Sequence, residues 1–248
     1  MSRTARTQSS TNVYHVILRG NNKQQIFLDD EDNTQFMKIL LGYKQSCDFM
    51  LLAYCLMGNH LHLLIKNGEQ PLSSIMKKIT VKFVYYYNIK YQRVGHLFQD
   101  RYKSEPVETE TYLLQVVRYI HNNPIKAELC QNFSEYAFSS YNDYFDKNIY
   151  CDTDYLLNII SLKDLKNFHN EKADDDVMDI TKTVVRVSDN SAVKIINTVY
   201  KDNNITNPLE MPKDVQIFIA GILRKKGLSV RQIARLTGIS YKFAASSE

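Results

Sequence analysis

Two apolar runs joined by a two-residue turn constrain the fold of this 248-residue chain more than any other feature. The first run is Phe49–Met57, and the second opens at His60 and continues to Lys66. Gly58-Asn59 between them is a turn signal, so the runs are predicted to form an antiparallel hairpin. Side chains alternate along a strand, so His60 and His62 are expected on the same face of the second strand.

The flanking segments extend the hairpin into a recognisable layout. Val13–Arg19 is predicted to be a strand, and Asp30–Ser46 is predicted to be a helix with acidic residues in its first turn. A long helix is predicted over Leu72–Tyr91 and an irregular strand over Phe98–Val107. This order fits a ferredoxin-like split βαβ fold, so we predict an α+β protein with an antiparallel sheet and helices on one of its faces.

Composition narrows the class of protein without naming a function. The chain has 44% hydrophobic residues and a net charge of +4, which permits nucleic-acid binding without establishing it. Its four cysteines form no CxxC pair and are predicted to be reduced thiols. No apolar run approaches the ~20 residues of a membrane span, and the polar N-terminus lacks a signal peptide's apolar segment. We expect a cytoplasmic, nucleoid-associated protein without a membrane partner.

We divide the chain into a catalytic-type domain over 1–145, a partly helical connecting region over 146–212 and a small basic module over 213–248. Between Val215 and Ser247 there are six Lys or Arg and no acidic residue. Ser229 with Gln232 has the spacing of a capping box, and the turn over 237–240 precedes another helix. This pattern resembles a helix-turn-helix, with Arg231 and Arg235 as candidate DNA contacts. Only eight residues follow Ser240, so the module is either a truncated reader of DNA or serves another role.

Three interpretations of the histidine pair remain open at this level. The first is structural, with both imidazoles hydrogen-bonded or solvated on the sheet. The second is a zinc site, but no nearby cysteine or third histidine completes a tetrahedral set. The third is a site for Mg²⁺ or Mn²⁺ that takes oxygen ligands from a DNA phosphate and one side chain. The position at a hairpin end favours the third interpretation, because a substrate can reach it there.

A tyrosine is the second candidate functional group, on a helix predicted over 109–122. The buried stripe of this helix consists of Leu113, Val116, Val117 and Ile120. At about 100° per residue, Tyr119 falls ~110° from the centre of that stripe, so its hydroxyl is expected to emerge beside the sheet.

Asn123, four residues after Tyr119, projects to the same flank and offers a carbonyl oxygen as a metal ligand. Pro124 follows and disfavours helical geometry at Asn123, so the helix is predicted to end there. An amphipathic helix with a boundary tyrosine and an Asn-Pro stop is the plain structural alternative. His121 is two residues from Tyr119 and points to another face, so we do not assign it as a base.

The stretch over 77–103 has the composition of a surface that binds single strands. It holds seven Lys or Arg against one acid, interleaved with aromatic residues. Phe83 and Tyr87 are predicted to belong to the core instead. The candidate DNA contacts in this domain are His15, Arg19, Lys78, Lys82, Arg101 and Lys103.

Four segments in order carry a family resemblance: YHVILRGNNKQQIF (14–27), LMGNHLHLLI (56–65), LFQDRYKSEPV (97–107) and RYIHNNPIKAEL (118–129). Together they resemble the REP-associated and insertion-sequence-200-like tyrosine transposases of the HUH superfamily, where U is a hydrophobic residue. The resemblance covers roughly residues 13–144. It implies that His60, His62 and Asn123 bind a metal and that Tyr119 is the nucleophile.

The resemblance also implies a reaction and a substrate. Tyr119 would attack a phosphorus and form a 5′-phosphotyrosine, with Mg²⁺ or Mn²⁺ as cofactor. The expected partner is hairpin-bearing single-stranded DNA, from a transposon end or a REP-like repeat, and a homodimer is an open possibility. A non-catalytic nucleic-acid-binding protein on a ferredoxin-like sheet and a metal phosphoesterase are the alternatives.

Overall fold

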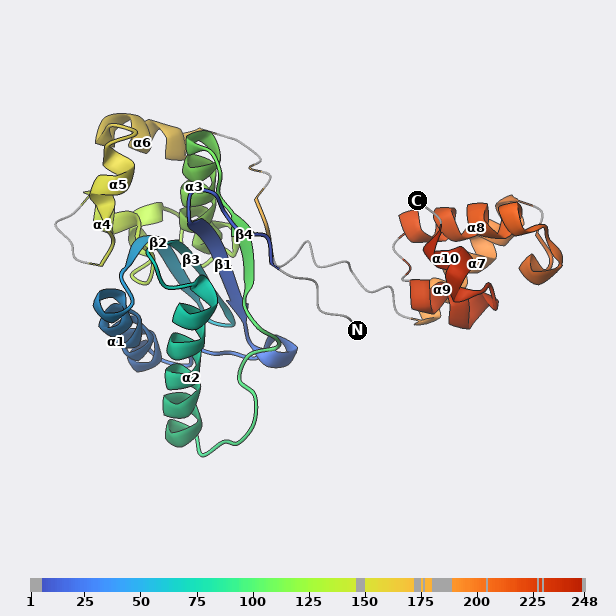
Figure 1. Cartoon of the computed structure of the whole chain (residues 1–248), viewed down its shortest axis with the longest axis horizontal. Coiled ribbons are helices and arrows are strands. Elements are labelled where there is room, and N and C mark those ends of the chain that lie inside the picture. Colours follow the sequence, from blue (N-terminus) through green and yellow to red (C-terminus); the bar gives the residue numbers. More distant parts are fainter. Residues whose placement is uncertain are drawn as a thin grey trace. The chain divides into compact units, whose positions relative to one another are not determined.

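The computed structural model describes residues 6–145, 150–171, 175, 177–179, 189–203, 205–226, 228 and 230–246. The chain divides into two compact units, Met1–Met178 and Asp179–Glu248 (Figure 1). This single division differs from the expected boundaries at residues 145 and 212. The expected connecting region does not stand alone, because its first half belongs to the first unit and its second half to the second.

A four-stranded antiparallel sheet forms the centre of the first unit. The strands are β1 (Val13–Arg19), β2 (Phe49–Met57), β3 (His60–Asn67) and β4 (Lys103–Pro106), in the order β2-β3-β1-β4. The β2–β3 hairpin closes where Met57 pairs with His60, as the turn signal predicted. The α+β class and the split βαβ strand order are confirmed. The last strand is shorter than expected, since Phe98 forms only an isolated bridge with Gly20.

Helices α1 (Asp30–Ser46) and α2 (Leu72–Lys90) cover one face of this sheet. Helix α1 begins after Asp29, whose side chain accepts a hydrogen bond from the backbone N–H of Asp32, in an N-cap. Both helices pack through large side chains, such as Phe36 and Phe83, onto Val16 and Leu63 of the central strands. The expectation of helices on one face therefore holds for α1 and α2.

A third helix, α3 (Glu110–Lys126), covers the opposite face, which corrects that expectation. Val116 and Ile120 pack there with Val13 and Leu64. The reason lies in the strands, because β1 and β2 are buried on both faces along nearly their whole length. A strand that is apolar on both faces needs a covering layer on each.

Helix α3 does not end at Asn123 but continues through Pro124 to Lys126. A proline in the last turn removes only one intrahelical hydrogen bond. The backbone carbonyls of Asn123 and Pro124 still accept bonds from Ala127 and Leu129, and Pro124 is buried. Packing of the last turn therefore outweighs the local preference of the Asn-Pro pair.

The rest of the first unit packs beside α3. It contains α4 (Tyr141–Phe145), α5 (Thr153–Leu157) and α6 (Leu162–Asn170). Leu165 and Val177 join the apolar cluster of α3. Arg118 of α3 forms a two-bond ion pair with Asp175, at 2.8 and 2.5 Å, and both side chains are only 6% exposed. This pair holds the chain at residue 175 against α3, well past the expected boundary at residue 145.

The second unit is helical in its described part. Its helices are α7 (Asp189–Asp202), α8 (Lys213–Lys225), α9 (Val230–Thr237) and α10 (Tyr241–Ala245). They enclose a core that includes Ile196, Leu223 and Ile233. Helices lie on both sides of the turn over 237–240, where Gly238 has a φ of +77°. Ser229, the predicted first residue of the capping box, lies outside the described residues.

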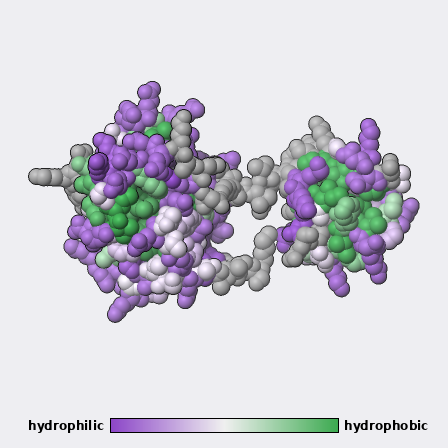
Figure 2. Space-filling model, turned by 90° about the horizontal axis from the view of Figure 1, so that it is seen from above, coloured by the Kyte–Doolittle hydropathy of each residue, from purple (hydrophilic) through white to green (hydrophobic). Residues whose placement is uncertain are grey.

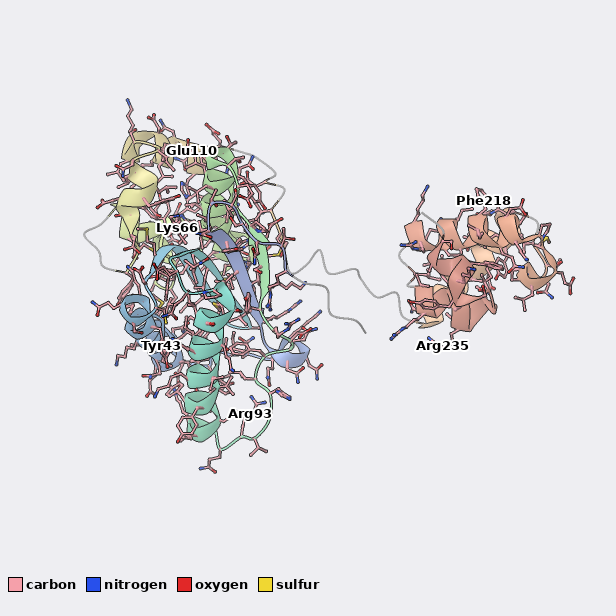
Figure 3. All side chains as sticks on the ribbon, viewed as in Figure 1. Tyr43, Lys66, Arg93, Glu110, Phe218 and Arg235 are labelled. Carbon is pink, nitrogen blue, oxygen red and sulfur yellow. The ribbon has the colours of Figure 1, made fainter. Side chains whose placement is uncertain are left out.

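The face in Figure 2 shows, on each unit, a hydrophobic area bordered by hydrophilic residues. Arg235 lies at the surface of the second unit, as Figure 3 shows. Among the helices that the structure describes, none has the length and apolarity that crossing a bilayer requires.

Candidate active site

Three histidines share the sheet face that α3 covers. His62 on β3 is paired with Ile17 on β1, so His15, two residues before Ile17, lies diagonally beside it. His15 Nε2 and His62 Nδ1 are 3.0 Å apart. The two rings are stacked, with centroids 5.3 Å apart and planes 19° apart, and both side chains are fully buried. His15 therefore does not line an open DNA path as expected, and instead contacts a predicted metal ligand.

One ring nitrogen of His62 makes no hydrogen bond within the described residues. Its Nδ1 faces His15, while its Nε2 is buried and has no hydrogen-bond partner among the described residues. Burial lowers the pKa of His62 well below its usual value, and the neighbouring His15 and His60 lower it further. The ring is therefore neutral at pH 7, and neutral imidazole is the form that binds metals.

His60 completes the pair at the hairpin end. Its ring centroid is 5.2 Å from that of His62, which supports the same-face prediction. Its Nδ1 lies 2.6 Å from the side-chain oxygen of Asn59, the second residue of the turn. Because that oxygen can only accept, Nδ1 donates the hydrogen bond, which leaves Nε2 as the ring's lone-pair nitrogen when the ring is neutral.

Tyr119 reaches this histidine face from α3. Its ring packs edge-on against His62 at 5.6 Å and against His15 at 5.9 Å, between ring centroids. The side chain is only 3% exposed. The expected position, with a hydroxyl emerging beside the sheet, is corrected to a ring buried between α3 and the sheet. The helical-wheel angle placed Tyr119 correctly on its flank, but the sheet lies under that flank too.

Asn123 follows one turn later and is 9% exposed. Its side-chain N–H donates to the backbone carbonyl of Tyr119 at 2.8 Å, so the amide oxygen is the atom left to act as a ligand. Within the described part of the chain, no group of three His, Cys, Asp or Glu could hold a metal. A third protein ligand beside His60 and His62 would therefore have to be of another type, and an amide oxygen is one.

Arg19 and Lys103 lie on the strands beside this arrangement, whereas Arg101 lies towards α2. Arg19 pairs with His60 across the strands, and its buried Nε has no hydrogen-bond partner in the described residues. Lys103 is exposed on β4 opposite Ile17. Arg101 is exposed and lines a cavity of about 560 Å³ together with Arg6, whose guanidinium stacks 3.8 Å over the Tyr102 ring.

Lys126 is a residue that sequence reasoning missed. Its Nζ lies 5.0 Å from the centroid of the Tyr119 ring. It is two helical turns from Tyr119, so the spacing was available as a signal. The predicted helix end at Asn123 hid it, because Lys126 belongs to the last turn that continues through Pro124.

Lys78 and Lys82 lie elsewhere, on α2, across the sheet from the histidines. They line a cavity of about 630 Å³ together with Lys77, Val81 and Tyr85. Tyr85 is 66% exposed, whereas Phe83 and Tyr87 are buried as predicted. The predicted DNA contacts in this domain thus fall on two faces of the sheet.

His121 belongs to a different cluster, as its position on the helix predicted. Its Nδ1 lies 2.8 Å from His169 Nε2, and its Nε2 lies 2.8 Å from Ser140 Oγ. Burial lowers the pKa of His121 well below its usual value, and His169 adds to the effect. All of these contacts face α6 and the 139–141 segment rather than the sheet histidines.

A comparison with protein families identifies the class of the domain that carries this sheet, its histidine pair and the helix-borne tyrosine. The family described as "Transposase IS200 like" matches residues 8–123. This segment is an IS200-like transposase domain, as the four sequence segments predicted.

Two solved structures are similar to this chain, and the first of them supports the fold. A REP-associated tyrosine transposase bound to a REP hairpin aligns with a TM-score of 0.50 and 19% identity, over 58% of this chain and 86% of that one. A protein of Deinococcus radiodurans R1 assigned as a transposase aligns with a TM-score of 0.35 and 19% identity, over 48% of this chain and 96% of that one. None of the curated proteins matches this chain significantly.

Proposed function

We propose that this transposase cleaves and rejoins hairpin-bearing single-stranded DNA through a covalent bond to Tyr119. One observation carries the proposal. Tyr119, from one helix, packs directly on His62 and next to the His60–His62 pair, from residues nearly sixty positions away. A tyrosine beside two imidazoles that could hold a metal is an arrangement that suits nucleophilic attack on a phosphate.

The step is a transesterification in which atoms balance. The Tyr119 oxygen forms a bond to phosphorus as the bond from phosphorus to the 3′-oxygen breaks. The phenol loses a proton, and the departing 3′-oxygen gains one to become a 3′-OH. The product is a 5′-phosphotyrosine that keeps the energy of the phosphodiester, so a 3′-OH can later reverse the reaction and join strands without ATP.

His60, His62 and Asn123 are the residues that would hold Mn²⁺ or Mg²⁺. The buried, unused Nε2 of His62 fits a metal, because an unpaired polar atom is otherwise costly to bury. When bound, the ion would polarise the scissile phosphate and offset the charge on its oxygens. An ordinary tyrosine has a pKa near 10, and the Lys126 ammonium beside the ring stabilises the phenolate.

The DNA would bind along a set of Arg and Lys side chains. Arg19 next to His60 and Lys103 on β4 would contact phosphates near the cleaved bond. Arg101 would contact the strand further towards α2. Lys78 and Lys82 would hold a more distant part of the strand on α2, where exposed Tyr85 offers a ring for base stacking. Arg231 and Arg235 on α9 would add contacts from the second unit. The REP hairpin bound by the solved relative supports a hairpin substrate, and a homodimer is compatible with this scheme.

The test is incubation with a 5′-labelled and a 3′-labelled single-stranded hairpin DNA in Mn²⁺, followed by a denaturing gel. A covalent species carrying the 3′-side fragment, absent in Tyr119→Phe, is the expected result. Tyr141→Phe is the matched control, because Tyr141 packs edge-on against His121 in the second cluster at 5.6 Å. Cleavage without an adduct would indicate a phosphoesterase, and binding without cleavage would indicate a non-catalytic binding protein.

A further inference from the structure

We infer that His15 is a positioning residue, which holds His62 in the one tautomer that leaves Nε2 with a lone pair for metal. This inference rests on the proposed function, since it concerns the ligand set proposed there. It replaces the predicted role of His15 as a DNA contact, which its complete burial contradicts.

The argument begins with the 3.0 Å contact between His15 Nε2 and His62 Nδ1. A neutral imidazole has one N–H donor and one acceptor nitrogen, so only two arrangements are available. If His15 donates, His62 Nδ1 accepts and its proton must be on Nε2, where it blocks metal binding. If His62 donates from Nδ1, its Nε2 is an acceptor. Only the second arrangement makes His62 a ligand.

Burial by itself does not choose between the two, because each arrangement buries one N–H, that of His62 Nε2 in the first and that of His15 Nδ1 in the second. Only in the second does His62 Nε2 carry a lone pair that a cation can use, so the proposed ligand role selects the second arrangement. Metal-bound histidines usually donate their other N–H to a fixed acceptor, and loss of that acceptor typically weakens binding 10–100-fold. Here the acceptor is another imidazole rather than a carboxylate or carbonyl.

Stacking fixes the ring orientation as well as the proton. The His15 and His62 planes are 19° apart, and the edge of Tyr119 closes the same space from α3. His62 therefore has little freedom to rotate its Nε2 away from the neighbouring His60. A substitution at His15 can be designed to separate the two effects, because phenylalanine keeps the stacking ring and removes the acceptor.

The experiment uses the full-length protein with ¹⁵N-labelled histidine and two variants, His15→Phe and His15→Gln. Glutamine places an acceptor oxygen near the position of Nε2. Imidazole ¹⁵N shifts in metal-free protein report the tautomer of His62, assigned by its loss in His62→Phe. Free Mn²⁺ measured by electron paramagnetic resonance gives the affinity, and circular dichroism checks that each variant is folded.

We expect the Nδ1–H tautomer of His62 in the wild type and in His15→Gln, and a mixture in His15→Phe. Mn²⁺ affinity should fall 10–100-fold in His15→Phe and be largely kept in His15→Gln. An Nε2–H tautomer in the wild type, or unchanged affinity in His15→Phe, would overturn the inference. So would an equal loss in both variants, since packing would then be the cause.

Failure of the proposed function would look different. If the wild type bound no Mn²⁺, the proposed ligand set would fail and this role for His15 with it. The metal-free tautomer would still show whether His15 fixes the His62 ring. If Mn²⁺ bound normally but no Tyr119 adduct formed, the proposed reaction would fail while the assignment of His15 stood.

Discussion

Two buried histidine pairs flank α3, with similar geometry but different use of their ring nitrogens. His15–His62 lies between α3 and the sheet, while His121–His169 lies on the other side of the helix. Both pairs are hydrogen-bonded, at 3.0 and 2.8 Å, and both are stacked, with centroids 5.3 and 5.1 Å apart. Burial lowers the pKa of His62 and of His121 alike. The two pairs differ in whether each ring nitrogen has a hydrogen-bond partner.

In the second pair every ring nitrogen has a partner. The backbone carbonyl of Leu165 can only accept, so His169 Nδ1 donates to it at 2.8 Å and His169 Nε2 accepts from His121 Nδ1. His121 Nε2 then accepts from the Ser140 hydroxyl. This chain of donors and acceptors is complete, which is typical of a structural cluster. In the first pair His62 Nε2 is left over. A vacant nitrogen distinguishes a candidate site where burial and lowered pKa values do not.

The largest expected effect concerns the tyrosines beside the two pairs. Tyr119→Phe should abolish the covalent adduct, a loss of more than about 10³-fold, because no other hydroxyl replaces the attacking oxygen. Tyr141→Phe should keep adduct formation within about twofold. Densitometry of the denaturing gel over a time course measures both. Equal adduct formation by Tyr119→Phe and the wild type would remove the functional difference between the two regions.

The next prediction compares Mn²⁺ binding and the free energy of unfolding in variants of the two histidine pairs. His62→Phe should abolish Mn²⁺ binding while changing the free energy of unfolding little. The substitution removes the unpaired buried Nε2 of His62, but it also leaves His15 Nε2 without its hydrogen-bond donor. His121→Phe should leave Mn²⁺ binding intact and cost about 1–3 kcal/mol, since His169 Nε2 loses its donor. The Ser140 hydroxyl can turn to the Tyr54 carbonyl 3.2 Å away, which limits that cost.

Urea unfolding and Mn²⁺ titration on the same preparations give both quantities. The reverse pattern, with stability lost at His62 and metal binding lost at His121, would contradict the assignment of the two pairs.

A third effect is the pH dependence of stability that the second pair predicts. Burial lowers the pKa of His169 to about 4, below its value of about 6.5 in the unfolded chain. The unfolded state therefore binds the proton more tightly, and stability falls as pH drops from about 6.5 to about 4, by up to ~1.4 kcal/mol per pH unit. Above pH 6.5 this contribution is fully present, and below pH 4 its loss is complete.

His169→Phe should flatten the dependence of the unfolding free energy on pH by about one proton across that window. Carboxylates that titrate there do so in both proteins, so the difference between the two curves isolates the histidine. Parallel curves for the wild type and the variant would show that His169 is protonated as readily in the folded chain as in the unfolded one.

The smallest effect is expected at Lys126. Its ammonium lies 5.0 Å from the Tyr119 ring centroid on an exposed turn, and a cation–π contact of this kind contributes about 0.5–1 kcal/mol. Lys126→Met should therefore slow adduct formation about two- to fivefold, while Lys126→Arg should restore it. Single-turnover rates with saturating hairpin DNA resolve such a change. A rate that is equal in the wild type and in Lys126→Met would confine Lys126 to a surface role.

Prediction from sequence succeeded where the signal is local. The bounds of α1 agree at both ends with the predicted helix, because the acidic first turn and the helical spacing are contained in seventeen neighbouring residues. Prediction failed at Pro124, where packing of the last turn of α3 outweighed a local rule. It failed also at the domain boundary near residue 145, since the Arg118–Asp175 ion pair joins residues 57 positions apart.

The sequence alone determined the hairpin, the shared face of His60 and His62, and the transposase family, since each depends on residue order and on the two-residue period of a strand. Tertiary structure decided that Tyr119 is buried, that His15 contacts His62, and that only one of two similar histidine pairs keeps a vacant nitrogen. The burial of Tyr119 depends on packing between α3 and the sheet, and the two histidine pairs depend on hydrogen bonds between residues 47 and 48 positions apart. A ring nitrogen is used or vacant according to what folds against it, and no local pattern of residues encodes that.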